Sequence, residues 1–166
     1  MTKNPGAGCV FTNGQMILAG LQSKQNQLVI SGIGGKSNEG ETPHETAMRE
    51  TIEELFGVTD VSTELILKLI ELLPINKTCG TDIYSIYVYT FDDLIKLLQL
   101  ASTYLISNLY EEFPSTLTDL IFKRKIDSNT EIRSLCLVPI CFNLSFDPYF
   151  VEDINRLIML PNENTL

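Results

Sequence analysis

Short apolar runs separated by turn-forming residues dominate the first thirty positions, a pattern typical of β-strands. Strands are predicted at residues 10–11 and 16–18, because Asn13-Gly14 between them favours a two-residue hairpin turn. A polar loop over residues 22–27 then leads to a third strand at residues 28–30. The chain is therefore expected to begin as β-structure.

The best-specified local element is a helix over residues 43–56. Thr42 can act as its N-cap, Pro43 suits the first helical position, and Glu45 completes a capping box. Gly57 is a natural stop for this helix. Glycines at positions 32, 34 and 35 precede the helix and predict a loop that the backbone of another segment can approach closely.

The second half of the chain alternates between helical and strand patterns. Residues 64–73 fit either an amphipathic helix or a mostly buried strand. Further strands are predicted at residues 82–91 and 135–140, and helical structure is predicted over residues 92–125, with a short helix at 116–122 after Pro114, and over 147–158.

A broad apolar stripe runs along the helical region that begins at residue 92. Its members recur at helical spacing: Leu94, Leu97, Leu98, Ala101, Leu105 and Leu109. Such a face is too broad to leave in water, and an exposed patch of this kind marks an interface. Three roles stay open for the stripe, namely a cover over a substrate cleft, a homodimer interface and ordinary core.

Composition and charge narrow the class of protein. With 166 residues, 44% apolar and 20% charged, we expect a single globular domain over residues 1–166. The longest uncharged stretch, residues 97–110, is too short and too polar to span a membrane. The net charge of −9 disfavours nucleic-acid binding, although a divalent cation could still mediate binding of a phosphorylated substrate.

Cysteine and histidine usage argues against a zinc site. The four cysteines show no CxxC spacing, and the chain has one histidine. The N-terminus has no apolar run of signal-peptide length, so we expect reduced thiols and a cytoplasmic location.

Three carboxylates share one face of the predicted 43–56 helix. Glu50, Glu53 and Glu54 stand at positions i, i+3 and i+4, where they repel one another unless a cation neutralises them. Mg²⁺ or Mn²⁺ suits such oxygen ligands, and a backbone carbonyl of the glycine loop can reach the same ion. Arg49 can brace the cluster through a bidentate bond to Glu41 or to one of the three acids.

The spacing of these residues resembles the Nudix box, G-x5-E-x7-R-E-U-x-E-E-x-G-U, in which U is aliphatic. Six residues fall in register with it: Gly35, Glu41, Arg49, Glu50, Glu53 and Glu54. Two positions depart from the pattern, since Thr51 occupies an aliphatic position and the closing glycine, Gly57, arrives one residue late, after Phe56. These departures affect the end of the helix and not the acids.

The resemblance implies an α/β fold, namely an α/β/α sandwich with a mixed β-sheet, here with a helical insert over residues 92–125. It also implies a metal-dependent hydrolase that cleaves the pyrophosphate bond of a nucleoside diphosphate linked to another moiety. The site residues that it implies are metal ligands at Gly34 (backbone carbonyl), Glu50, Glu53 and Glu54, and catalytic roles for Glu41, Arg49, Glu53 and Glu54.

The general base and the substrate stay open at this point. In the family Glu53 or Glu54 can serve as base, or an acid from a distant loop, for which the Glu111-Glu112 pair is the candidate. The lead-in at residues 32–36 is similar to the GxGGK of members that hydrolyse damaged nucleoside triphosphates, whereas Pro74 lies near the spacing of ADP-ribose hydrolases.

We therefore expect a small free nucleotide, of nucleoside triphosphate or nucleotide-sugar type, as the substrate. Capped mRNA and dinucleoside polyphosphates are alternatives within the fold, as is a binding or regulatory module without catalysis. Three tyrosines, Tyr84, Tyr87 and Tyr89, could stack a nucleobase, but core packing is the expectation. His44 is expected to be exposed and to take no part in catalysis.

Overall fold

The predicted first hairpin is present, and its two strands lead into different parts of one mixed sheet. The computed structural model describes residues 5–127, 129–140 and 150. In this part of the chain the sheet has seven strands: β1 (Gly6–Thr12), β2 (Met16–Lys24), β3 (Gln27–Ser31), β4 (Ile33–Lys36), β5 (Lys77–Thr81), β6 (Tyr84–Thr90) and β7 (Ile132–Pro139).

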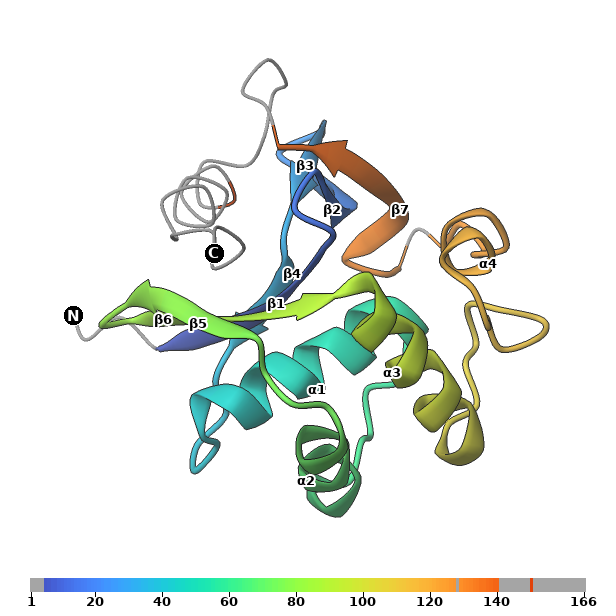
Figure 1. Cartoon of the computed structure of the whole chain (residues 1–166). Coiled ribbons are helices and arrows are strands. Elements are labelled where there is room, and N and C mark those ends of the chain that lie inside the picture. The colour runs from blue at the N-terminus through green and yellow to red at the C-terminus, as the bar shows by residue number, and fades with distance from the viewer. Residues whose placement is uncertain (1–4, 128, 141–149, 151–166) are drawn as a thin grey trace, which may run out of the picture.

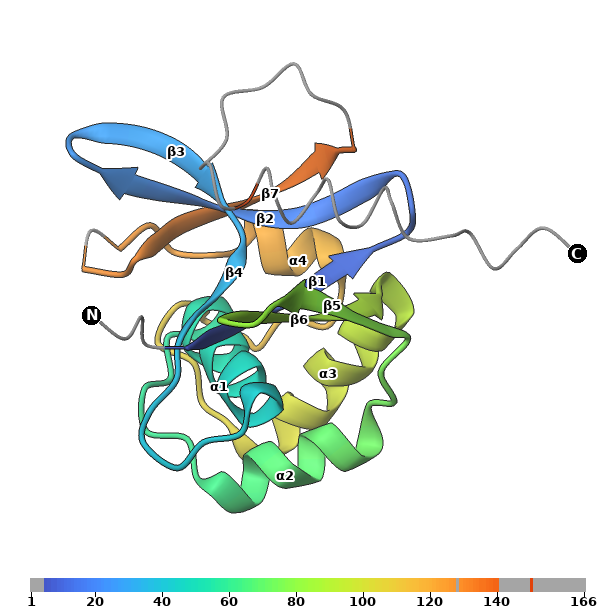
Figure 2. The same cartoon turned by 90° about the vertical axis from the view of Figure 1, so that its left-hand side faces the viewer.

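β1 and β2 pair beside their turn, where Thr12 faces Ile17, and then take different partners. β1 pairs with β4 in antiparallel and with β6 in parallel orientation, whereas β2 pairs antiparallel with β3 and β7. The strand order is β3-β2-β1-β6-β5, with β4 beside β1 and β7 beside β2. The sheet therefore has two arms, one formed by β1, β4, β5 and β6 and the other by β2, β3 and β7. Figures 1 and 2 show these arms diverging from the first hairpin.

Helices pack on one face of the arm formed by β1, β4, β5 and β6 (Figures 1 and 2). These helices are α1 (Pro43–Phe56), α2 (Thr63–Leu72) and α3 (Phe91–Tyr104), whereas α4 (Leu117–Phe122) contacts β7. This arrangement confirms the predicted α/β class with a mixed sheet. Among the described residues, the helices are all too short or too polar to cross a bilayer.

The opposite face of the sheet carries a second, smaller apolar cluster. It includes Val10, Ile17 and Val88 from the strands, and Phe150, whose side chain is 1% exposed. Phe150 falls within the helix predicted over residues 147–158, and the rest of that segment lies outside the described residues.

Local signals place α1 and α2. Thr42 is the N-cap of α1 and forms the predicted capping box with Glu45, and Gly57 ends the helix with a left-handed φ of 70°. The predicted bounds of α1 are confirmed. The ambiguous segment at 64–73 is helical, because the Ser62 hydroxyl accepts the Leu65 N–H and begins α2.

Two predictions about the strands were wrong, and one strand was not predicted. The polar loop at 22–27 is the end of β2, a tight turn at Gln25-Asn26 with φ values of 48° and 64°, and the start of β3. The glycine-rich segment at 32–35 is largely strand β4, because β1 supplies hydrogen-bond partners for it. Strand β5 was not predicted, since its sequence, KTCGT, is polar and lies at a sheet edge.

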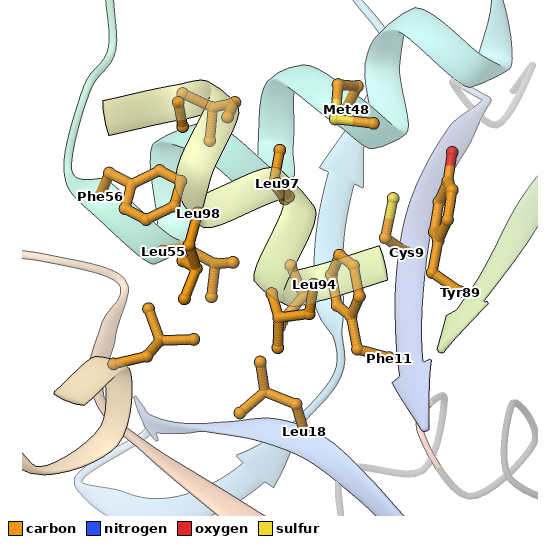
Figure 3. Packing of buried hydrophobic residues seen from close by; sticks show 14 of the residues in the cluster. Cys9, Phe11, Leu18, Met48, Leu55, Phe56, Tyr89, Leu94, Leu97 and Leu98 are labelled. Atoms are coloured by element: carbon orange, nitrogen blue, oxygen red, sulfur yellow. The ribbon is translucent and has the colours of Figure 1, made fainter. Parts of the chain in front are cut away.

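The apolar stripe beginning at Leu94 is ordinary core. Leu94, Leu97 and Leu98 are 0% exposed, and Figure 3 shows their side chains among those of Leu55 and Phe56 on α1 and strand residues. The proposed roles as a cleft cover or a homodimer face are therefore wrong for this stripe. A helix that packs against both the sheet and neighbouring helices needs an apolar face as broad as this one.

His44 is not exposed, contrary to the expectation from sequence. Its ring stacks on Tyr87 with centroids 4.2 Å apart, and its Nε2 lies 2.7 Å from the Tyr89 hydroxyl. Tyr89 is 1% exposed and stacks on Phe11, so core packing is confirmed for this tyrosine. The contact joins the first turn of α1 to β6.

The stability of the protein is expected to depend on the protonation of His44. Burial lowers the pKa of His44 from its ordinary 6.5, so the unfolded chain binds a proton more readily than the native protein does. The contribution of neutral His44 is present above pH 6.5 and is lost as the pH falls toward the folded pKa. Denaturant unfolding between pH 7.5 and 5.5 should therefore show the free energy of unfolding of the wild type falling relative to that of His44→Phe. Because His44 is the one histidine in the chain, titrating groups common to the two proteins cancel in this difference. If the free energies of unfolding of the two proteins changed with pH in parallel, the prediction would be contradicted.

Candidate active site

One guanidinium organises the acidic face of α1. Arg49 is 8% exposed, and each of its five N–H groups has an acceptor. Nε donates to Glu41 at 2.6 Å, Nη1 donates to Glu50 at 2.8 Å and to Glu53 at 3.2 Å, and Nη2 donates to Glu41 at 3.1 Å and to the Lys36 carbonyl at 2.9 Å. Arg49 therefore draws three carboxylates together and attaches α1 to β4.

Glu41 is held as an anion on the other side of this guanidinium. Hydrogen bonds from Arg49 lower its pKa to about 2, with further help from the Asn38 N–H and the Thr46 hydroxyl. The predicted ion pair between Glu41 and Arg49 is present. Glu41 precedes the helix, so its contact with Arg49 also fixes how the chain enters α1.

The close approach predicted at the glycines is made by the side chain of Glu50, which lies against Gly35. A Cβ on Gly35 would lie 2.4 Å from the Glu50 carboxyl carbon, so a larger residue at position 35 would displace that carboxylate. The helix and β4 can thus lie close together with an acid between them.

Glu54 is the most deeply buried of the acids. It is 9% exposed, and the Gly34 N–H donates to its Oε2 at 2.8 Å. Burial raises its pKa well above the ordinary 4.5, and the negative charges of Glu131 and Glu50 raise it further. Burial likewise raises the pKa of Glu50, against the influence of Arg49.

Glu131 is a fourth acid at this face, and sequence reasoning missed it. It immediately precedes β7, and the amide of Gln22 on β2 donates to its Oε1. The candidate from a distant loop, Glu111-Glu112, is exposed between α3 and α4, and no described hydrogen bond or ion pair joins either residue to α1. The pairing of β7 with β2, which are distant in the sequence, brings Glu131 to the acids of α1, so no local signal could have identified it.

The donor chemistry of this face fits a hard divalent cation. Glu50, Glu53, Glu54 and Glu131 offer carboxylate oxygens, while Arg49 is already shared among three acids, so negative charge is left in excess. Among the described residues, no three acidic, histidine or cysteine side chains are yet gathered closely enough to hold an ion. The ion pairs with Arg49 keep Glu50 and Glu53 directed toward the guanidinium.

Comparisons with known proteins identify the family and the fold. The sequence matches the NUDIX domain family over residues 2–101, which is more than half of the chain. No curated protein matches the sequence.

The fold is shared with solved structures, among them the following two. The Nudix hydrolase RenU from M. smegmatis is 16% identical, with a TM-score of 0.51, over 98% of this chain and 90% of that chain. A bifunctional NMN adenylyltransferase/ADP ribose pyrophosphatase from Francisella tularensis is 12% identical, with a TM-score of 0.52, over 95% of this chain and 42% of that chain. At these identities the likeness concerns the fold alone.

The buried charge of Glu54 is expected to reduce the stability of the metal-free protein. Because its folded pKa is raised, ionised Glu54 opposes folding at neutral pH, and this cost disappears below about pH 4.5, where the carboxyl is protonated in both states. Glu54→Gln should therefore raise the free energy of unfolding at pH 7 in excess EDTA by on the order of 1 kcal/mol, and by much less at pH 4. Glu39→Gln, at an exposed position, is the control and should change little at either pH. Equal effects of Glu54→Gln at the two pH values would contradict the prediction.

Proposed function

This chain belongs to the NUDIX domain family and is a Nudix pyrophosphohydrolase, and we propose that it hydrolyses the pyrophosphate bond of a small free nucleotide. The substrate would be a nucleoside triphosphate or a nucleotide sugar. The observation that carries the proposal is the face of α1, where Arg49 holds Glu41, Glu50 and Glu53 around one guanidinium. Acids on a merely solvated face would not share one buried arginine.

Nudix hydrolases generally depend on a divalent metal, and we propose Mg²⁺ or Mn²⁺ for this chain. The residues that would hold it are Glu50, Glu53, Glu54 and the Gly34 carbonyl, and the bound ion would polarise the phosphate and lower the pKa of a water. Support comes from the acidic oxygen donors and from the negative charge left beside buried Glu54.

The protein side chains have separate roles in this proposal. Glu41 and the Lys36 carbonyl fix Arg49, which in turn orients Glu50 and Glu53. The general base takes a proton from the attacking water, and Glu54 is one candidate, because burial raises its pKa and so makes its carboxylate a better proton acceptor than that of an ordinary glutamate. Glu131, which faces the same acids from β7, is the second candidate.

The acidic character of the chain supports a small nucleotide over capped RNA. A net charge of −9 offers little attraction for a polyphosphate backbone, whereas a small nucleotide needs cationic charge at one point only. One of the structures that share the fold is described as an ADP ribose pyrophosphatase, so ADP-ribose belongs among the substrates to be tested.

Hydrolysis should require a divalent cation. Purified protein is incubated with a panel of nucleoside triphosphates, ADP-ribose, other nucleotide sugars, dinucleoside polyphosphates and a capped oligonucleotide, with Mg²⁺, Mn²⁺ or excess EDTA. We expect turnover of a small nucleotide with either ion and none with EDTA, read as the phosphate product formed. Turnover that persists in EDTA would contradict metal dependence, and selective turnover of the capped oligonucleotide would contradict the proposed substrate class.

Replacing the acids near α1 should lower kcat, whereas replacing an acid of the Glu111-Glu112 pair should not. Glu53→Gln removes a charge from the proposed metal site and should lower kcat by roughly 10²-fold or more. Glu131→Gln should lower kcat as well, because the missing charge faces Glu50 and Glu54. Glu112→Gln is the matched control at an exposed position. Wild-type rates for both Glu53→Gln and Glu131→Gln would contradict this assignment of the site.

A further inference from the structure

The C-terminal end of α1 is closed by residues from a distant part of the chain. Its last four carbonyls all have donors: the Gly57 N–H binds the Glu53 carbonyl at 2.8 Å, and the Ser107 hydroxyl binds the Phe56 carbonyl at 2.5 Å. Arg124 donates to the two between them, Glu54 and Leu55, at 2.8 Å each. Three of these four carbonyls are therefore bound by residues that lie far from α1 in the sequence.

Arg124 also binds the strand that directly follows Glu131, the acid that sequence reasoning missed. Its Nη2 donates to the Ile132 carbonyl at 2.9 Å as well as to the Glu54 carbonyl. Ile132 begins β7 and directly follows Glu131. One guanidinium thus bridges the backbone of Glu54 and the backbone next to Glu131.

Burial and charge indicate that this bridge is a strong one. Arg124 is 8% exposed, and its two terminal nitrogens donate to three backbone carbonyls. The last turn of α1 contains no basic residue of its own. Arg124 therefore supplies the positive charge that a helix C-terminus favours, and a charged donor buried at carbonyls is costly to remove.

We propose that Arg124 is a positioning residue, which holds Glu54 on α1 and Glu131 beside β7 in a fixed relation across the active site. Its hydrogen bonds to α1 and β7 go to backbone carbonyls, so it would act through these two acids. The inference rests on the proposed function, because a fixed relation between the acids matters only where they serve a common metal and substrate.

The same helix end offers a matched control. Ser107 binds the last carbonyl of α1 but makes no described contact with β7, so Ser107→Ala removes a cap without removing the bridge. Arg124→Lys keeps the charge, but a compact ammonium cannot reproduce the planar fork that reaches all three carbonyls. Arg124→Gln removes the charge and keeps a shorter donor.

The test combines binding of Mn²⁺ alone with kinetics. The dissociation constant for Mn²⁺ is measured by electron paramagnetic resonance without nucleotide, and kcat, KM and Tm are measured on the folded proteins. We expect Arg124→Lys and Arg124→Gln to weaken Mn²⁺ binding and lower kcat by about 10-fold or more, on the scale of residues that orient metal ligands. KM should change much less. Ser107→Ala should lower Tm and leave Mn²⁺ affinity and kcat as in the wild type.

Three results would overturn the proposal. Mn²⁺ affinity and kcat within about twofold of the wild type in folded Arg124→Lys would assign Arg124 to stability alone. Equal losses in Ser107→Ala would show that any weakened helix end has the same effect. Unfolding of both Arg124 variants would also make its role structural.

The wild type separates this proposal from the proposed function. A wild type that binds no Mn²⁺, or that binds it and hydrolyses nothing, contradicts the proposed function. A wild type that binds and hydrolyses while the Arg124 variants match it contradicts only the role of Arg124.

Discussion

The acidic helix α1 of this protein depends on one buried arginine. Glu41, Glu50 and Glu53 carry three negative charges within hydrogen-bonding distance of Arg49, and buried Glu54 lies on the same helix. Acids held this close would repel one another and raise their pKa values if nothing compensated them. Arg49 compensates three of them, and its bond to Lys36 ties that compensation to the sheet.

The need to hold acids between α1 and the sheet explains why the neighbouring strand, β4, contains glycines. An acid can lie between helix and sheet only if the strand has no side chain there, and Gly35 leaves this space for Glu50. The neighbouring Gly34 N–H is a hydrogen-bond donor for Glu54. Gly34 and Gly35, which predicted a loop of close approach, are therefore part of a paired strand, where their lack of side chains lets the backbone lie close to the acids.

Residues after α3 pack against the end of α1, where Gly57 stands one position later than in the Nudix box. Phe56 occupies the position of the expected glycine, is 0% exposed and packs against Phe113 with centroids 4.7 Å apart. Ser107 binds the carbonyl of Phe56, and Leu109 lies against Gly57. The segment between α3 and β7 thus receives the altered helix end, and it also contributes Arg124.

The sequence by itself determined those features that depend on residues close together in the chain. The capping box at Thr42, the stop at Gly57 and the spacing from Glu41 to Glu54 involve residues close together in the chain, so their geometry follows from a helix and a turn. Partners distant in the chain required the tertiary structure. Glu131 reaches the acids through the pairing of β7 with β2, Arg124 reaches α1 from some seventy positions away, and the α3 stripe is core because α1 and the sheet cover it. A periodic pattern indicates that a face must be buried but not by what, and a single charged residue has no pattern at all; only the folded chain identifies its partner.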